Sequence, residues 1–126
     1  MQSVFLVDDS PLVRERLASM IGALPCTRVV GEAAGAEQAI HGILEAQPDV
    51  VLVDLSLKQG SGFDVLDAVH RQAPAIAVYM LSNFAAEPYR RHAERLGASG
   101  FFDKSTELER LRAVLRGDRP CPPSSH

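Results

Sequence analysis

Short runs rich in β-branched and aromatic residues alternate along this chain with stretches of helical periodicity. The runs lie at residues 4–7, 28–31, 50–53, 76–81 and 101–102. The first, third and fourth are continuously apolar, which is typical of strands covered on both faces of a sheet. We therefore expect five strands, three of them buried on both faces.

The intervening stretches show the apolar period of helices. Apolar residues recur at helical spacing within residues 13–24, 36–44, 66–73 and 108–115, and residues 87–96 form a more charged segment. Ser10 before a proline and Ser61 are typical helix starts, and Gly97 stands where the fourth helix should end. The alternation predicts an α/β protein with a five-stranded, mainly parallel sheet flanked by five helices.

The composition is that of an ordinary globular domain. The chain has 126 residues, of which 46% are hydrophobic and 23% are charged, so it can bury a core without a metal or a disulfide. We expect one domain over residues 1–117 and a disordered tail, rich in proline and serine, over residues 118–126.

Charge, apolar length and cysteine spacing bear on partners and location. The formal net charge of −3 argues against a direct nucleic-acid partner, because phosphate binding favours a basic surface. The longest apolar stretch, residues 75–81, is too short to cross a bilayer, so we expect no membrane contact. Cys26 and Cys121 belong to no CxxC pair, and we expect two free thiols in a reducing cytoplasm.

Polar residues follow four of the predicted strands at their carboxyl ends. They are Asp8, Asp9, Asp54, Ser82 and Lys104. Each alone could cap a helix, open a turn or face solvent. Together they are expected in one place, because the carboxyl ends of parallel strands share the sheet edge at which ligands bind.

The three carboxylates would repel one another unless a cation neutralised them. Oxygen ligands of this kind suit Mg²⁺. A phosphoryl group could then approach, and Asp54 could attack phosphorus to become an aspartyl phosphate. Lys104 could pair with one phosphoryl oxygen and Ser82 could bond another. The residues alone therefore indicate phosphoryl transfer to a carboxylate.

Four segments carry a family pattern. They are Val7-Asp8-Asp9-Ser10, Val53-Asp54-Leu55-Ser56-Leu57 with Gly62, Leu81-Ser82-Asn83, and residues 97–104. In these segments, and over about residues 3–116, the chain resembles the receiver domain of two-component response regulators, whether stand-alone or detached from a longer protein. The resemblance implies a flavodoxin-like, doubly wound sheet with strand order 2-1-3-4-5.

The resemblance also implies a role for each residue of the cluster. Asp54 would be the phosphoacceptor, and Lys104 and Ser82 would assist the transfer. The ligands of Mg²⁺ or Mn²⁺ would be Asp8 (mostly through water), Asp9, Asp54 and the backbone carbonyl of Ser56. Beyond this self-catalysed transfer and a slow autodephosphorylation, no enzyme activity is expected.

Two further residues would form the switch of such a domain. Phosphorylation would draw the Ser82 hydroxyl inward, and the Phe101 ring would follow. The change would alter the face made by the fourth helix, fifth strand and fifth helix, where a downstream protein would bind. The phosphoryl donor would be a sensor histidine kinase or a phosphotransfer protein, and the domain would be a monomer or a phosphorylation-dependent dimer.

The chain departs from the family pattern at four positions. Lys58 and Ser105 stand where prolines are common, and Asn83 replaces a small residue after the switch hydroxyl. An apolar ring at Phe84 would hinder a hydrolytic water, so we expect slow autodephosphorylation. The family often has a cis bond before the proline that Ser105 replaces; before a non-proline residue a cis bond costs about 2.5–4 kcal/mol. Either this strain is kept or the loop differs.

Two other functions fit parts of the pattern. A flavodoxin-like, flavin-binding electron carrier shares the fold, but Asp8 and Asp9 would repel the flavin phosphate. A Mg²⁺-dependent phosphatase with an aspartyl-phosphate intermediate shares the chemistry, but it needs a second acid/base and a cap over its substrate. Residues 60–62 begin like a dinucleotide fingerprint, yet valine follows at position 65, so we expect no organic cofactor.

Overall fold

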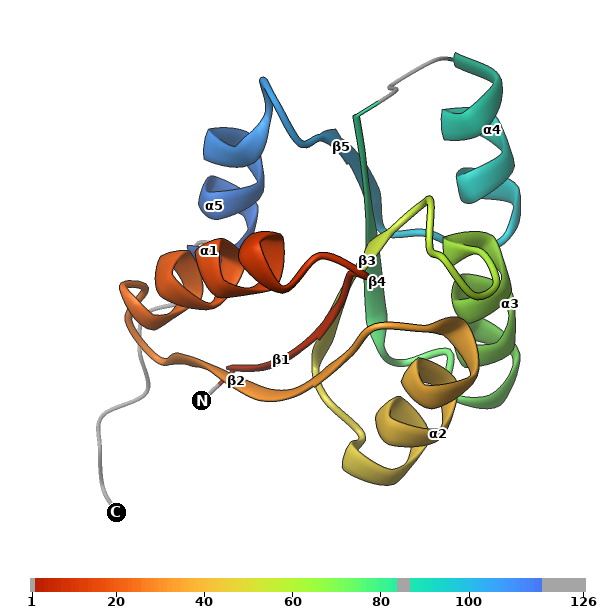
Figure 1. Ribbon diagram of the computed structural model, residues 1–126, viewed down its shortest axis with the longest axis horizontal. Coiled ribbons are helices and arrows are strands. Elements are labelled where there is room, and N and C mark those ends of the chain that lie inside the picture. Colours follow the sequence, from red (N-terminus) through yellow and green to blue (C-terminus); the bar gives the residue numbers. More distant parts are fainter. Residues whose placement is uncertain (1, 84–86, 117–126) are drawn as a thin grey trace.

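A parallel sheet forms the centre of the fold. The computed structural model describes residues 2–83 and 87–116. Its strands are β1 (Gln2–Val7), β2 (Thr27–Ala33), β3 (Val50–Asp54), β4 (Ala77–Ser82) and β5 (Gly100–Asp103). All neighbouring strands pair in parallel in the order β2-β1-β3-β4-β5 (Figure 1). The predicted fold class and strand order are confirmed.

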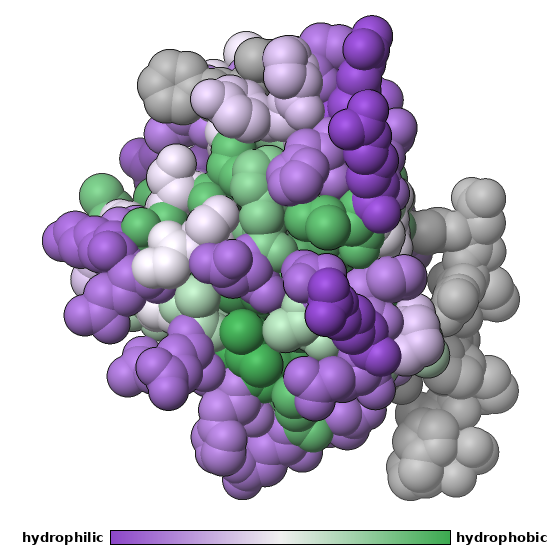
Figure 2. Space-filling view, turned by 90° about the vertical axis from the view of Figure 1, so that its right-hand side faces the viewer, coloured by the Kyte–Doolittle hydropathy of each residue, from purple (hydrophilic) through white to green (hydrophobic). Residues whose placement is uncertain are grey.

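Helices cover both faces of this sheet. α1 (Pro11–Gly22) and α5 (Leu108–Arg116) lie on one face, and α2 (Ala36–Ala46), α3 (Gly62–Gln72) and α4 (Glu87–Arg95) lie on the other (Figure 1). The core is divided accordingly into two hydrophobic clusters. Figure 2 looks onto the side with α2, α3 and α4, where hydrophobic residues show between hydrophilic ones.

Capping residues fix the ends of three helices. The Ser10 hydroxyl accepts a hydrogen bond from the Val13 N–H at 3.3 Å, and α1 begins at the next residue. Ser61 and Asp64 form a reciprocal capping box at the start of α3. Gly97, just after α4, has a φ of +100°, a conformation that glycine adopts without strain. The sequence signals for these three ends are confirmed.

The structure tests some of the predictions about the cysteines, the C-terminal tail and the membrane. Cys26 is disulfide-bonded, so the prediction of a free thiol there is wrong, because the absence of a CxxC pair does not exclude a bond between distant cysteines. Cys121 and the expected tail, residues 118–126, lie outside the described residues. Among the helices of residues 2–83 and 87–116, none is long and apolar enough to cross a membrane.

Candidate functional site

The carboxyl ends of four strands bring the predicted site residues to one edge of the sheet. Asp8 and Asp9 follow β1, Asp54 ends β3 and Ser82 ends β4, while Lys104 follows β5. A carboxylate oxygen from each of the three aspartates lies within 4.8 Å of the others. The sheet therefore gathers residues that are up to 96 positions apart.

Lys104 supplies the positive charge within this acidic cluster. Its Nζ lies 2.6 Å from Oδ2 of Asp8 and 3.2 Å from Oδ2 of Asp54. The side chains of Lys104, Asp8 and Asp54 are only 12%, 1% and 10% exposed. Because few waters can screen these charges, each ion pair is stronger than it would be at the surface.

Asp8 is held from several directions. Its Oδ1 accepts a hydrogen bond from the Ser10 N–H at 2.9 Å, and its backbone carbonyl accepts one from the Arg14 guanidinium. Arg14 also pairs with Glu32, which lies in β2, at 3.1 Å. Arg14 was not predicted as a site residue, because its only sequence signal is its place in the first turns of the helix that follows Asp8.

The environment of Asp54 raises its carboxyl pKa. Burial is the main cause, and the negative charge of Asp8 adds to it, while Lys104 and the Ser56 N–H lower the pKa in part. The Ser56 N–H lies 3.4 Å from Oδ1 of Asp54. The Asp54 carboxylate is therefore costly to hold ionised, which favours ligands that bring positive charge to it.

The loop after Asp54 needs a glycine at position 62. The Gly62 N–H donates to the Leu55 carbonyl at 2.9 Å, which brings the start of α3 against the backbone of the acidic residue. A Cβ atom on Gly62 would lie 2.3 Å from the Asp54 carbonyl oxygen and 2.9 Å from the Leu55 Cα. Gly62 thus sets how closely α3 approaches the site.

The two expected switch residues lie on neighbouring strands. Ser82 is buried at the end of β4, and its carbonyl accepts a hydrogen bond from the Lys104 N–H at 2.8 Å. Phe101 is 9% exposed and lies in β5 beside Met80 of β4. Its ring belongs to the hydrophobic cluster on the α2–α4 side.

The structure describes three of the four positions that depart from the family pattern. Lys58 and Asn83 are exposed, and Phe84 is outside the described residues. No peptide bond among the described residues is cis, so the loop after Lys104 has the ordinary geometry. The Ser105 N–H donates to Oδ1 of Asp103 at 2.7 Å, and the Ser105 hydroxyl donates to the same oxygen. These bonds lower the pKa of Asp103.

The acidic cluster fits a hard divalent cation. In an octahedral Mg²⁺ site with ligand distances near 2.1 Å, ligand oxygens are about 3 to 4.2 Å apart. The oxygens of Asp8, Asp9 and Asp54 approach that spacing, and the donors are all of the type that Mg²⁺ prefers. Ser56, whose backbone carbonyl is a predicted ligand, follows Asp54 by two residues.

Comparison with known families identifies this arrangement. The family model described as "Response regulator receiver domain" matches residues 4–116, nearly all of the described chain. The chain belongs to the response regulator receiver family. In this family, an acidic pocket generally binds Mg²⁺, and an aspartate of the pocket is phosphorylated. The predicted family is therefore confirmed, and it leaves no support for the flavin-binding alternative.

Solved receiver structures share the fold closely. The signal receiver domain of the putative response regulator NarL from Mycobacterium tuberculosis is 31% identical, with a TM-score of 0.82, over 90% of this chain and 93% of that chain. The response regulator domain of Thermotoga maritima CheB is 28% identical, with a TM-score of 0.81, over 91% of this chain and 90% of that one.

Curated relatives of this receiver are transcriptional regulators. The "DNA-binding transcriptional activator DevR/DosR" of Mycobacterium tuberculosis is 34% identical over 90% of this chain and 53% of that protein. The nitrate/nitrite regulator NarL of Escherichia coli K12 is 31% identical over 90% of this chain and 52% of that protein. The chain thus spans about half the length of these relatives.

These relatives contradict the expectation that nucleic acid is not a partner. That expectation used the net charge of −3, but one relative is a DNA-binding activator by name. The charge of a receiver domain does not report on the DNA binding of a regulator, because the two properties can reside in different parts of a protein. The prediction of no nucleic-acid partner is wrong.

Proposed function

We propose that Asp54 accepts a phosphoryl group from a sensor histidine kinase or a phosphotransfer protein in a Mg²⁺-dependent reaction. The observation that carries this proposal is the convergence of Asp8, Asp9 and Asp54 within 4.8 Å, with the Lys104 ammonium 3.2 Å from Asp54. The ligands of the ion would be Asp9, Asp54 and the Ser56 carbonyl, with Asp8 nearby. We place this activity in the cytoplasm, where the donor would meet it.

The transfer needs an ionised Asp54 carboxylate as the nucleophile. One oxygen of Asp54 forms a bond to phosphorus while the bond from phosphorus to the donor's imidazole nitrogen breaks. The nitrogen keeps the bonding electron pair, and the released imidazole then exchanges protons with solvent. Lys104 stabilises the charge on one phosphoryl oxygen, and the Ser82 hydroxyl donates to another. Mg²⁺, held by Asp9, Asp54 and the Ser56 carbonyl, would neutralise negative charge on the phosphoryl group.

The phosphoryl group would change the surface far from Asp54. Ser82 and Phe101 link the site to the face formed by α4, β5 and α5, and this face would bind a downstream protein. Because relatives of this receiver include a DNA-binding activator, we propose that the phosphorylation state controls a DNA-binding output. The domain would act as a monomer or as a phosphorylation-dependent dimer.

Intact-mass measurement tests the acceptor directly. The protein is incubated with Mg²⁺ and acetyl phosphate, and we expect one phosphoryl adduct on the wild type and none on Asp54→Asn. Asp67→Asn is the matched control, because Asp67 lies in α3, outside the cluster, and its carboxylate lies 3.1 Å from the Arg71 guanidinium. An adduct that persists on Asp54→Asn would contradict the proposal. Repeated turnover of a phosphate ester would instead favour the phosphatase alternative.

The lifetime of the aspartyl phosphate is a separate proposal. We propose that autodephosphorylation is slow, because Asn83 and Phe84 follow the switch hydroxyl and would limit access for a hydrolytic water. After the donor is removed by desalting, the adduct should decline slowly in intact-mass spectra. Asn83→Ala should shorten its lifetime. Rapid loss from the wild-type protein would remove this idea.

A further inference from the structure

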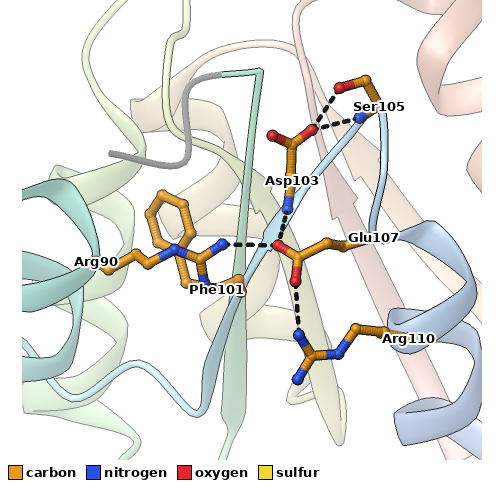
Figure 3. Close-up of polar contacts among 6 residues, drawn as sticks. All are labelled: Arg90, Phe101, Asp103, Ser105, Glu107 and Arg110. Carbon is orange, nitrogen blue, oxygen red and sulfur yellow. Dashed lines mark hydrogen bonds and ion pairs between the residues drawn. The ribbon is translucent and has the colours of Figure 1, made fainter. Parts of the chain in front are cut away.

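A chain of polar contacts joins α4 to the beginning of α5 across β5 (Figure 3). Arg90, in α4, donates from one terminal nitrogen to the Phe101 carbonyl at 3.0 Å. Its other terminal nitrogen lies 2.7 Å from Oε1 of Glu107. The guanidinium carbon lies 5.1 Å from the centre of the Phe101 ring, within the range of a cation–π contact. Arg90 therefore contacts both the backbone and the ring of Phe101.

Glu107 fixes the position of the Arg90 guanidinium. Its Oε1 also accepts a hydrogen bond from the Asp103 N–H at 3.0 Å, and its Oε2 lies 2.8 Å from the Arg110 guanidinium (Figure 3). These contacts hold the pKa of Glu107 below its usual value, the Asp103 N–H first and Arg90 next. The carboxylate stays ionised near neutral pH, so Arg90 has a permanent partner.

We propose that Arg90, oriented by Glu107, is a positioning residue that holds the Phe101 ring in its buried place before any phosphoryl group is bound. An outward turn of the ring would sacrifice its contact with the guanidinium. Movement of α4 away from β5 would also break the hydrogen bonds from Arg90 to the Phe101 carbonyl and to Glu107. The ring and the helix are thus tied together by one side chain.

The type of residue matters at position 90. A guanidinium is planar, so it can lie over a ring while its two terminal nitrogens bind separate acceptors. A lysine ammonium would offer one charged point and could not make all three contacts. We expect Arg90→Lys to keep the charge of the surface but lose much of the hold on Phe101.

The same contacts reach the loop that carries Lys104. Glu107 accepts from the N–H of Asp103, the residue before Lys104, and the Glu107 N–H donates to the Asp103 carbonyl at 2.9 Å. The end of β5 is therefore clamped to the start of α5. Arg90 connects that clamp to α4. The contacts of Glu107 therefore join α4, β5 and α5, the three elements of the proposed partner face.

Fluorine NMR tests this inference without phosphorylation. The five phenylalanines are replaced by 4-fluorophenylalanine, and the Phe101 signal is assigned by its loss in Phe101→Leu. A soluble paramagnetic relaxation agent then reports how exposed that ring is. In Arg90→Ala we expect the paramagnetic relaxation of the Phe101 signal to rise severalfold. Arg91→Ala is the matched control, because Arg91 is exposed on the same helix and lies 3.8 Å from Glu87, a long distance for an ion pair.

Two more variants separate positioning from a general loss of structure. Glu107→Gln keeps an oxygen for the Asp103 N–H but removes the charge that orients Arg90, so the relaxation should rise to an intermediate value. Arg90→Lys should behave like Arg90→Ala more than like the wild type. The role of the Phe101 ring as a switch rests on the proposed function, but the measurement uses unphosphorylated protein. Wild-type relaxation of the Phe101 signal in both Arg90→Ala and Glu107→Gln would overturn it, whether or not Asp54 accepts a phosphoryl group.

Discussion

The ammonium of Lys104 lies nearer to Asp8 than to any other carboxylate of the cluster, with 2.6 Å between Nζ and Oδ2. The contact to Asp54 is longer, at 3.2 Å. Asp8 thus holds the lysine beside the proposed acceptor. The family resemblance implies that Asp8 acts on the metal mostly through water, and the structure adds this direct ion pair to Lys104. A phosphoryl group on Asp54 would compete with Asp8 for the same ammonium.

Removal of the Lys104 charge should destabilise the fold. Lys104→Met leaves the buried carboxylates of Asp8 and Asp54 without their cation, and the loss of one partner of a buried pair costs about 3 kcal/mol. We expect the free energy of unfolding, measured in urea with EDTA, to fall by about that amount. Millimolar Mg²⁺ should restore part of it, because the ion neutralises the same carboxylates.

Lys58→Met is the control for that measurement. It removes the same charge from an exposed position, and surface substitutions usually change stability by less than about 0.5 kcal/mol. Equal stabilities for the two variants in EDTA would show that Lys104 does not neutralise the cluster.

The raised pKa of Asp54 predicts a pH dependence of stability. The folded protein keeps the Asp54 proton to a higher pH than the unfolded chain does. The free energy of unfolding should therefore decrease as the pH rises through the unfolded and then the folded pKa, and this contribution should be constant above both. Asp54→Asn removes the cost of the buried charge, so it should raise the melting temperature at pH 7 in EDTA and have less effect at pH 4.

Asp67→Asn provides the comparison for Asp54→Asn, since it makes the same chemical change on the exposed side of α3. Its melting temperature should stay close to that of the wild type at both pH values. A lower melting temperature for Asp54→Asn at pH 7 would contradict the assigned sign.

Gly62→Ala should be strongly destabilising. Its Cβ would lie 2.3 Å from the Asp54 carbonyl oxygen, which is backbone and cannot turn away. Overpacking of this kind costs about 1–3 kcal/mol, measurable as a lower urea midpoint. Gly22→Ala is the matched control: nothing lies within 4 Å of its Cβ, and alanine favours a helix by up to about 1 kcal/mol. Similar effects of the two substitutions would exclude a steric role for Gly62.

The capping box of α3 should contribute measurably to stability. The Ser61 hydroxyl accepts from the Phe63 N–H at 3.1 Å, and the Asp64 carboxylate accepts from the Ser61 N–H at 3.1 Å. Ser61→Ala removes the first bond and should cost about 1 kcal/mol in urea unfolding. Ser61→Asp retains a capping oxygen and should restore most of the loss. If alanine and aspartate destabilise equally, the cap is not the cause.

The sequence predicts the structural features that depend on a local pattern of residues. Continuous apolar runs identify the buried strands, and the position of Asp54 or Lys104 just after a run places it at the correct sheet edge. Contacts between surface side chains of separate elements leave no such pattern. The sequence marks residues 87–96 only as a charged segment, although Arg90 within it bonds to Phe101 and Glu107. Strand order came from the family resemblance, because spacing alone does not fix it.

The order of strands along the chain has a consequence for protein synthesis. Asp8, Asp9 and Asp54 are translated well before Lys104, which is the last of the clustered residues to leave the ribosome. A nascent chain that ends before β5 has three mutually repelling carboxylates and no amine between them. Charge balance within the cluster arrives only after residue 104 has left the ribosome.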